Sequence, residues 1–461
     1  MPLAFRDKRV MVLGLGDTGL SALRWLKDRA AALSVADTRE APPGLATVRQ
    51  EMPGVNVHLG VFDAALLAQQ DMLVVSPGVP LAEPAIRQAQ AAGVDVVGDV
   101  ELFARAHDGG RIIAITGSNG KSTVTSLVGH LCASAGLDTV VAGNIGLPVL
   151  DALVEREHGS GRPDVWVLEL SSFQLEATCS LRPDAATVLN VSADHMDRYD
   201  TLDDYTAAKA RIFAGCSTQV LNREDTLVMA MAQPDCRIQT FGLGAASGAA
   251  DWGLAAHDGQ IWLSRGQERL LVLDELPLAG LHNAANALAA LALCDAVGID
   301  EASLLPALKT FKGLPHRVEF VAEIDGRRFY DDSKGTNIGA TVAALRGFSA
   351  PVVLIAGGDG KGQDFTHMTD AVRQHARAVV LIGRDAPQIA AALQDSGAIV
   401  QHAASMQDAV AMAYELGEPG DVVLLSPACA SFDMFRNYAH RAEVFCEAVR
   451  SLAGNRQEVT G

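Results

Sequence analysis

The sequence of 461 residues is 49% hydrophobic but only 5% aromatic, a balance that favours an α/β protein of two to four domains, at roughly 100–200 residues each. Its formal net charge of −18 argues against a general nucleic-acid or anionic-membrane surface, although a local loop with Mg²⁺ can still bind phosphate. Seven scattered cysteines without a C-x-x-C pair indicate reduced thiols in a cytoplasm, and no apolar run approaches the roughly 18 residues of a membrane helix.

Short β-branched runs alternate with Ala- and Leu-rich helical patterns almost throughout, which predicts βαβ units on parallel sheets. The expected strands, in chain order, are 10–13, 72–76, 94–97, 111–115, 165–170, 186–190, 352–355, 378–382 and 422–425. Residues 245–273 break this rhythm and predict an antiparallel excursion, and residues 282–297 form a long helical pattern. Boundaries near Gly98 and at residues 313–315 divide the chain into three predicted domains, 1–99, 100–313 and 314–461.

A glycine-rich turn follows the first predicted strand. Gly14, Gly16 and Gly19 have the G-x-G-x-x-G spacing, and Asp37 lies about 20 residues further on, as in turns that cradle a diphosphate. The motif by itself suggests an NAD-dependent oxidoreductase. It discriminates weakly, because such a turn holds any diphosphate, and a tight turn without a ligand remains an alternative.

A second glycine-rich turn, at residues 116–123, follows the strand predicted at 111–115 and precedes a helical pattern. Backbone N–H groups and the helix N-terminus in such a turn bind phosphate. Lys121 is placed to reach the β- and γ-phosphates of a nucleotide, and Ser122 or Thr123 to meet Mg²⁺. Ile115 stands where the strict P-loop pattern has its first glycine, and the alternative is a helix start with a solvent-exposed lysine.

Glu169 and His195 follow two further predicted strands of the same series. Ligands of open parallel sheets collect at the carboxyl ends of strands, so both residues are placed to hold Mg²⁺ near the P-loop. The alternatives are a capping or salt-bridging carboxylate and a hydrogen-bonded structural histidine.

Three polar loops follow predicted strands in the last third of the chain, at residues 331–337, 357–362 and 426–433. They predict a polar, basic rim, with ordinary βα loops as the alternative. Cys429 in the third loop has no partner signature of a thiol nucleophile, and we expect a small buried residue there.

These motifs, in this order, resemble the Mur ligase family of bacterial cell-wall synthesis, which also has relatives such as folylpolyglutamate synthase. The segments that carry the resemblance are 116–123, 169–175, 190–198, 282–286, 315–317 and 332–334. The resemblance implies an α/β fold of three domains, each with a mainly parallel sheet. These would be a Rossmann-like domain for UDP, a central P-loop ATPase domain and a Rossmann-like domain for the incoming amino acid.

The implied activity is ATP-dependent addition of D-glutamate to UDP-N-acetylmuramoyl-L-alanine through an acyl phosphate, in cytoplasmic peptidoglycan precursor synthesis. ATP is then a co-substrate, two Mg²⁺ ions are expected, and we expect a monomer without nucleic-acid partners or membrane insertion. A dehydrogenase, a non-catalytic nucleotide sensor and a ligase for another amino acid are the rivals. Residues 194–197 and 426–433 favour the glutamate enzyme over the last of these.

The resemblance also implies residue roles. The catalytic residues would be Lys121, Glu169, His195 and Lys209, and the metal ligands Ser122, Glu169, His195 and Lys209, with a carbamate on Lys209. From the sequence pattern alone, Lys209 would be a solvent-exposed lysine on a surface helix. ATP would be bound by Gly117, Ser118, Asn119, Gly120, Lys121, Ser122, Thr123, Asn283, Asn286, Arg317 and Asp332. The UDP substrate would be bound by Gly14, Leu15, Gly16, Asp17, Thr18, Gly19, Asp37, Thr38, Arg39, Pro77, Gly78 and Asn144. Glutamate would be bound by Lys334, Thr336, Lys361, Ser431, Phe432 and Tyr438.

Overall fold

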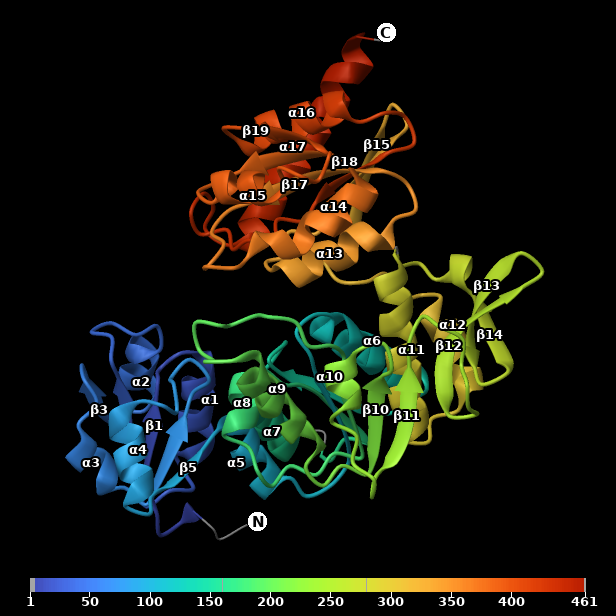
Figure 1. The fold of residues 1–461 in the computed structure, drawn as a ribbon. Coiled ribbons are helices and arrows are strands. Elements are labelled where there is room, and N and C mark those ends of the chain that lie inside the picture. Colours follow the sequence, from blue (N-terminus) through green and yellow to red (C-terminus); the bar gives the residue numbers. More distant parts are fainter. Residues whose placement is uncertain (1–4, 160, 279, 460–461) are drawn as a thin grey trace.

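The computed structural model describes residues 5–159, 161–278 and 280–459. The chain forms three α/β domains, each around its own sheet (Figure 1). This confirms the predicted fold class. The outermost residues of the first and third predicted domains, 1–4 and 460–461, lie outside the described residues.

The N-terminal domain has a five-stranded, entirely parallel sheet in the order β3-β2-β1-β4-β5. Its strands are β1 (Arg9–Leu13), β2 (Ala32–Asp37), β3 (Asn56–Leu59), β4 (Met72–Val75) and β5 (Asp95–Val97). Its helices are α1 (Asp17–Leu26), α2 (Leu45–Glu51), α3 (Ala64–Ala68) and α4 (Pro84–Ala91). The strand order reverses between β1 and β4, and a crevice for a ligand opens at such a point. The turn at Gly14 therefore leads into this crevice.

The central domain has a nine-stranded sheet in the order β14-β13-β12-β11-β10-β9-β6-β8-β7. Its strands are β6 (Arg111–Thr116), β7 (Thr139–Gly143), β8 (Val165–Glu169), β9 (Ala185–Val188), β10 (Thr218–Asn222), β11 (Arg237–Phe241), β12 (Asp251–His257), β13 (Gln260–Arg265) and β14 (Glu268–Val272). Its helices, with α5 leading in from the first domain, are α5 (Asp99–Ala106), α6 (Lys121–Ser134), α7 (Val149–His158), α8 (Ser172–Glu176), α9 (Leu202–Ala210), the 3-10 helix η2 (Arg211–Phe213), α10 (Thr226–Met229), η3 (Leu273–Glu275), α11 (Leu281–Ala296) and α12 (Glu301–Leu308).

The antiparallel excursion predicted over residues 245–273 is confirmed. Strand β13 runs antiparallel to both β12 and β14, whereas the strand pairs from β6 to β11 are parallel. The three strands extend the sheet at one edge, away from the P-loop strand β6 (Figure 1).

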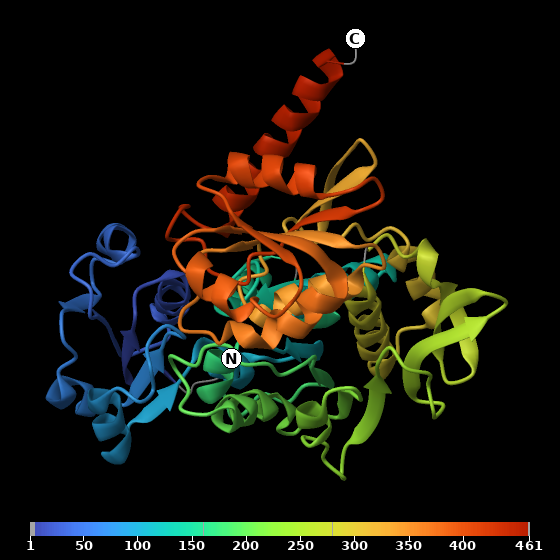
Figure 2. The ribbon, with the colours of Figure 1, turned by 45° about the horizontal axis from the view of Figure 1, so that its top comes forward.

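The C-terminal domain has a six-stranded sheet in the order β15-β16-β20-β17-β18-β19, parallel except for β15 against β16. Its strands are β15 (Glu319–Ile324), β16 (Arg327–Asp331), β17 (Val352–Gly357), β18 (Ala376–Ile382), β19 (Ile399–His402) and β20 (Val422–Leu425). Its helices are α13 (Ile338–Gly347), η4 (Phe365–Met368), α14 (Thr369–His375), α15 (Ala386–Ala392), α16 (Met406–Leu416) and α17 (Tyr438–Val459). The end of α17 projects away from the molecule (Figure 2).

Both outer domains lie against the central one. Helices α1 and α5 pack on α7 at the first junction, and α13 packs near α11 at the second (Figures 1 and 2). Among the described residues, no helix has the length and apolar character that crossing a bilayer requires. The two junctions are where the carboxyl ends of the strands, and hence the predicted ligand sites, come together.

Candidate active site

The P-loop connects β6 to α6 and needs glycine for its shape. Gly120 has φ +84°, and a Cβ atom there would lie 2.7 Å from Oδ1 of Asn286. A side chain would therefore be both strained and blocked. The loop brings the N-terminus of α6 close to the start of α11, as a nucleotide site requires.

Lys121 folds back over this loop. Its Nζ donates to the carbonyl oxygens of Gly117 at 2.8 Å and Ser118 at 3.0 Å. Desolvation lowers the pKa of Lys121, and the charges of Glu169 and Asp194 oppose that shift. The alternative of a solvent-exposed lysine is excluded by these contacts.

A cavity of about 240 Å³ opens beside the P-loop, between the central and third domains. From the predicted ATP residues it collects Asn119, Gly120, Thr123, Asn283, Asn286, Arg317 and Asp332, with Lys334 beside them. Gly117, Ser118, Lys121 and Ser122 lie in the adjoining turn and are not part of its lining. Residues from two domains therefore enclose one cavity beside the P-loop.

Arg317 is the clearest contact across this junction. Its Nη2 donates to Oγ of Ser122 at 3.0 Å. Desolvation lowers its pKa, while the charges of Asp332 and Glu169 raise it. The third domain thus places a cation on the first turn of α6.

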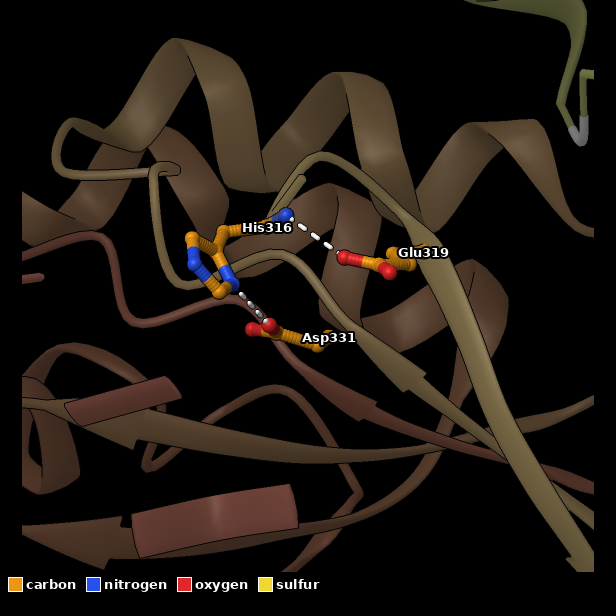
Figure 3. Close-up of side chains that lie close together, drawn as sticks. All are labelled: His316, Glu319 and Asp331. Atoms are coloured by element: carbon orange, nitrogen blue, oxygen red, sulfur yellow. Dashed lines mark hydrogen bonds and ion pairs between the residues drawn. The ribbon is translucent and has the colours of Figure 1, made fainter. Parts of the chain in front are cut away.

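Figure 3 shows a cluster of three side chains, His316, Glu319 and Asp331, two of which are near neighbours of Arg317 in the sequence. Nδ1 of His316 lies 2.7 Å from Oδ2 of Asp331, and the backbone N–H of His316 donates to Oε2 of Glu319 at 2.9 Å. His316 and Val318 have φ values of +62° and +51°, a backbone conformation that residues other than glycine rarely adopt. The three side chains could offer ligand atoms within 4.8 Å of one another, but their hydrogen bonds account for the arrangement.

Asp332 stands at the end of β16 inside the same cavity. Oγ of Ser426 donates to its Oδ2 at 2.7 Å. Burial raises the pKa of Asp332 to about 7, against the lowering effects of Ser426 and Arg317. A carboxyl group with such a pKa can change charge when a nucleotide and its counter-ions arrive.

Glu169 is the last residue of β8 and is only 1% exposed. Nδ2 of Asn144 donates to its Oε1 at 2.7 Å, whereas the buried Oε2 has no hydrogen-bond partner among the described residues. An unpaired buried carboxylate oxygen is costly unless something binds it. The salt-bridge alternative is thereby set aside, and the donor fits a hard cation.

Lys209 is not on the surface. It is 1% exposed on α9, its Nζ donates to the Gly117 carbonyl at 2.9 Å, and it lies 4.3 Å from the centre of the Tyr205 ring. Burial lowers its pKa well below the ordinary value, and the charge of Lys121 adds to the shift. The surface-lysine alternative is therefore wrong, because the side chain points into the P-loop.

His195 is partly exposed in the loop after β9 and has φ +57°. Its ring meets that of Phe173 edge-on at 4.9 Å, and desolvation lowers its pKa, which favours the neutral imidazole. Asp194 is a site residue to which the sequence motif assigned no separate role. Its carboxylate accepts from Asn337 of the third domain at 3.2 Å. Desolvation lowers the pKa values of Lys121, Lys209 and His195, and the charge of Asp194 partly offsets that lowering.

A second cavity, of about 800 Å³, lies between the first and central domains. From the predicted UDP residues it collects Gly14, Gly16, Asp17, Thr18, Asp37, Thr38, Arg39, Pro77, Gly78 and Asn144. Asn144 therefore lines this cavity and also holds Glu169, which connects the second cavity to the P-loop side.

Two predicted UDP residues support the turn instead of lining the cavity. Leu15 is fully buried, and its backbone N–H donates to Oδ2 of Asp37 at 2.7 Å. A Cβ atom on Gly19 would lie 1.9 Å from the carbonyl oxygen of Gly14. Asp37 also binds the guanidinium of Arg39, and that side-chain hydrogen bond lowers the pKa of Asp37 to about 2.

The six predicted glutamate residues do not share one cavity. Lys334 lines the 240 Å³ cavity and lies 3.8 Å from the centre of the Tyr438 ring. Lys361 lines a separate cavity of about 650 Å³ with Asp194 and His195. Of the remaining residues, Thr336 is half-buried, Ser431 is buried and Phe432 is 74% exposed.

Two further residues qualify the predictions for the third domain. Cys429 is fully buried as expected, and burial raises the pKa of its thiol to about 12. Arg441 is also fully buried and was missed, because nothing in its local sequence marks it. Its guanidinium donates to the Ser333 carbonyl at 2.8 Å and to the Cys429 carbonyl at 3.1 Å, and so joins two of the predicted polar loops.

Three family models match the chain in order. They are the Mur ligase MurD-like N-terminal domain over residues 8–98, the Mur ligase middle domain over 115–294, and the Mur ligase glutamate ligase domain over 316–429.

Full-length relatives and solved structures agree with these matches. The chain is 60% identical to UDP-N-acetylmuramoylalanine--D-glutamate ligase from Methylobacillus flagellatus, over 98% of each chain. It is 57% identical to the protein of that name from Chromobacterium violaceum, over 98% of this chain and 99% of the other. MurF from Acinetobacter baumannii shares the fold with a TM-score of 0.59 at 17% identity, covering 95% of this chain and 90% of that one. The UDP-N-acetylmuramate-alanine ligase MurC from Thermotoga maritima does so with 0.57 at 22%, covering 96% and 100%.

Proposed function

The chain belongs to the Mur ligase family, and from that premise we propose how its cavities work. It is an ATP-dependent ligase that adds D-glutamate to UDP-N-acetylmuramoyl-L-alanine in peptidoglycan synthesis, the activity named for relatives that match almost its whole length. That whole-chain identity carries the conclusion, because a shared fold alone does not specify a substrate. The dehydrogenase alternative leaves the P-loop without a purpose, and the sensor alternative leaves the buried Glu169 and Lys209 without one.

In the proposed reaction, the γ-phosphoryl group of ATP passes to the carboxylate of the L-alanyl residue and gives an acyl phosphate and ADP. The amine of D-glutamate then attacks the acyl carbon, the amide bond forms, and phosphate leaves as the nitrogen gives up a proton. The protein contributes position and opposing charge, since phosphoryl transfer needs little covalent help. Lys121 and Arg317 supply fixed cations at the P-loop.

Mg²⁺ supplies positive charge that offsets the charge on the phosphate oxygens. We assign its binding, for two ions, to Ser122, Glu169, His195 and Lys209. Two observations support this assignment, because a metal binds a free carboxylate oxygen and a neutral imidazole. Oε2 of Glu169 has no partner among the described residues, and the lowered pKa of His195 favours its neutral form.

The assignment needs Lys209 as an anion. An unmodified ammonium group would repel a metal, but burial lowers the pKa of this amine well below its ordinary value and so favours the neutral form. A neutral amine adds CO₂ with loss of one proton, which gives a carbamate whose oxygens suit Mg²⁺. The same desolvation that disfavours the ammonium form therefore favours the modification.

We place the uridine diphosphate part of the substrate in the 800 Å³ cavity and the adenine near Asn283 and Asn286. Lys334, Thr336, Lys361, Ser431, Phe432 and Tyr438 are the proposed glutamate contacts. Lys334 and Lys361 line different cavities, but all six residues belong to the third domain. A movement of that domain on ligand binding would therefore carry them toward the P-loop together.

We also propose a monomer in the cytoplasm. The seven cysteines are free thiols, as expected in a reducing compartment.

Phosphate release with UDP-N-acetylmuramoyl-L-alanine, ATP and a panel of amino acids tests the function. We expect release with D-glutamate and little with lysine, meso-diaminopimelate or alanine, because two lysines suit an acidic side chain and repel a basic one. Faster release with lysine or diaminopimelate would overturn the assigned substrate.

A further inference from the structure

We propose that Arg198 is a positioning residue that ties the uridine-side turn to the loop of His195, so that the UDP part of the substrate raises turnover as well as affinity. The inference rests on the proposed function, because it assumes uridine in the first cavity. Arg198 itself lines neither of the two main cavities.

Arg198 belongs to the central domain but contacts the first. Its Nη1 donates to the carbonyl oxygen of Pro77 at 2.9 Å, and Nη2 to that of Val79 at 3.4 Å. Pro77, Gly78 and Val79 form a turn that lines the 800 Å³ cavity. One planar guanidinium thus grips the backbone of the turn at two points.

The other contacts of Arg198 fix its position in the central domain. Nη2 also donates to Oε2 of Glu176 at 3.3 Å, and the guanidinium carbon lies 4.3 Å from the centre of the Phe173 ring. The side chain is 14% exposed. An arginine held by a carboxylate, an aromatic ring and two carbonyls is far more ordered than a surface arginine.

The backbone of Arg198 is joined directly to His195. The N–H groups of Arg198 and Tyr199 both donate to the His195 carbonyl, at 2.9 and 3.2 Å. Phe173, which lies under the guanidinium, also meets the His195 ring. A displacement of the turn at residues 77–79 would therefore reach His195 by two routes. One is the backbone turn from His195 to Arg198, and the other is the Phe173 ring, which both side chains contact.

This connection gives the uridine group a way to act on the chemistry. Binding energy from a remote part of a substrate raises turnover only if it helps to assemble the reacting centre. Arg198 supplies the physical link, because the turn that uridine contacts and the loop that carries His195 share this residue.

The experiment compares wild type with Arg198→Gln and Arg198→Lys. Hydrogen exchange is measured with and without saturating UDP, and kcat and KM for UDP-N-acetylmuramoyl-L-alanine are measured in parallel. In wild type we expect UDP to slow exchange severalfold in residues 76–79 and also in residues 192–199. In Arg198→Gln, UDP should still protect residues 76–79 but no longer residues 192–199. We also expect kcat to fall on the order of tenfold and KM to change less. Arg198→Lys keeps the charge but cannot span both carbonyls, and we expect an intermediate result.

Arg29→Gln is the matched control. Arg29 also joins the first and central domains, through Glu157 at 2.5 Å, and it is held within the first domain by the Trp25 carbonyl at 2.6 Å and the Trp25 ring at 4.7 Å. It lies beyond the C-terminal end of α1, whose N-terminal end faces the cavity. This variant should keep the UDP effect on residues 192–199 and a kcat within about twofold of wild type.

Each other outcome has a meaning. Protection of residues 192–199 that survives in Arg198→Gln, or that is absent in wild type, overturns the inference, and so does a change in KM alone. If Arg29→Gln behaves like Arg198→Gln, general domain stability is responsible and the inference fails. If UDP changes hydrogen exchange in neither segment, both the inference and the proposed uridine site are overturned. The phosphate-release assay in wild type tests the proposed function separately.

Discussion

At the scale of single residues, Lys209 determines most about the proposed chemistry, because a buried lysine beside Lys121 is unfavourable without a purpose. We expect Lys209→Ala to reduce turnover by about 10- to 100-fold, the loss typical when a residue that supports a metal site is removed. Short carboxylates such as formate or acetate should restore part of the phosphate release by occupying the gap. Wild-type rates for Lys209→Ala at limiting Mg²⁺ would refute the role.

The same residue gives a prediction about stability and pH. Since the pKa of Lys209 is lowered in the folded protein, the unfolded chain binds one more proton between that value and the ordinary lysine pKa of about 10.4. Stability therefore rises with pH across this window and is penalised at neutral pH. Without Mg²⁺ and CO₂, Lys209→Met should be more stable than wild type in urea at pH 7, and its advantage should shrink near pH 10. An advantage that does not depend on pH would contradict the lowered pKa.

At the scale of elements, two glycines of one turn make different contributions. A Cβ atom on Gly19 would meet the Gly14 carbonyl at 1.9 Å, whereas one on Gly16 would meet nothing within 4 Å. We expect Gly19→Ala to lower the free energy of unfolding by about 1–3 kcal/mol, the usual cost of overpacking, because α1 must move off the turn. Gly16→Ala should change it by less than about 0.5 kcal/mol. Equal losses in chemical denaturation would show that the contact does not set the packing.

Most elements that carry function follow from sequence patterns. The strand at residues 422–425 is found with the same bounds as β20, and those predicted at 111–115 and 165–170 differ by one residue from β6 and β8. Glycine turns and strand ends were predictable because their geometry is local. The contacts of Asp194, Arg198 and Arg441 were not, since each joins segments far apart in the chain and no local period reports such a pair. The burial of Lys209 was likewise hidden, because an Ala-rich helix reads the same on the surface as in the interior.

At the scale of the whole molecule, the two ligand cavities lie at different junctions, and this should separate their effects on unfolding. The nucleotide cavity is lined by Asn283 and Asn286 of the central domain and by Arg317 and Asp332 of the third, whereas the 800 Å³ cavity lacks third-domain residues. Calorimetry should show that a non-hydrolysable ATP analogue with Mg²⁺ raises the melting temperatures of the central and third domains. At 100 times its Kd, the analogue should add about 2.7 kcal/mol to the free energy of unfolding. UDP should raise the melting temperatures of the first and central domains only. Stabilisation of the third domain by UDP alone would contradict this separation.

The antiparallel extension of the central sheet has a consequence for solubility. Strand β14 is the outermost strand there, so one side of its backbone can still pair with a strand from another molecule. It is short, at five residues, and begins with Glu268 and Arg269, both exposed. Charges on a short edge strand discourage the edge-to-edge pairing that starts aggregation. In a crowded cell, these two side chains would help to keep a chain with a nine-stranded sheet from assembling into fibrils or inclusion bodies. This effect would not depend on any ligand.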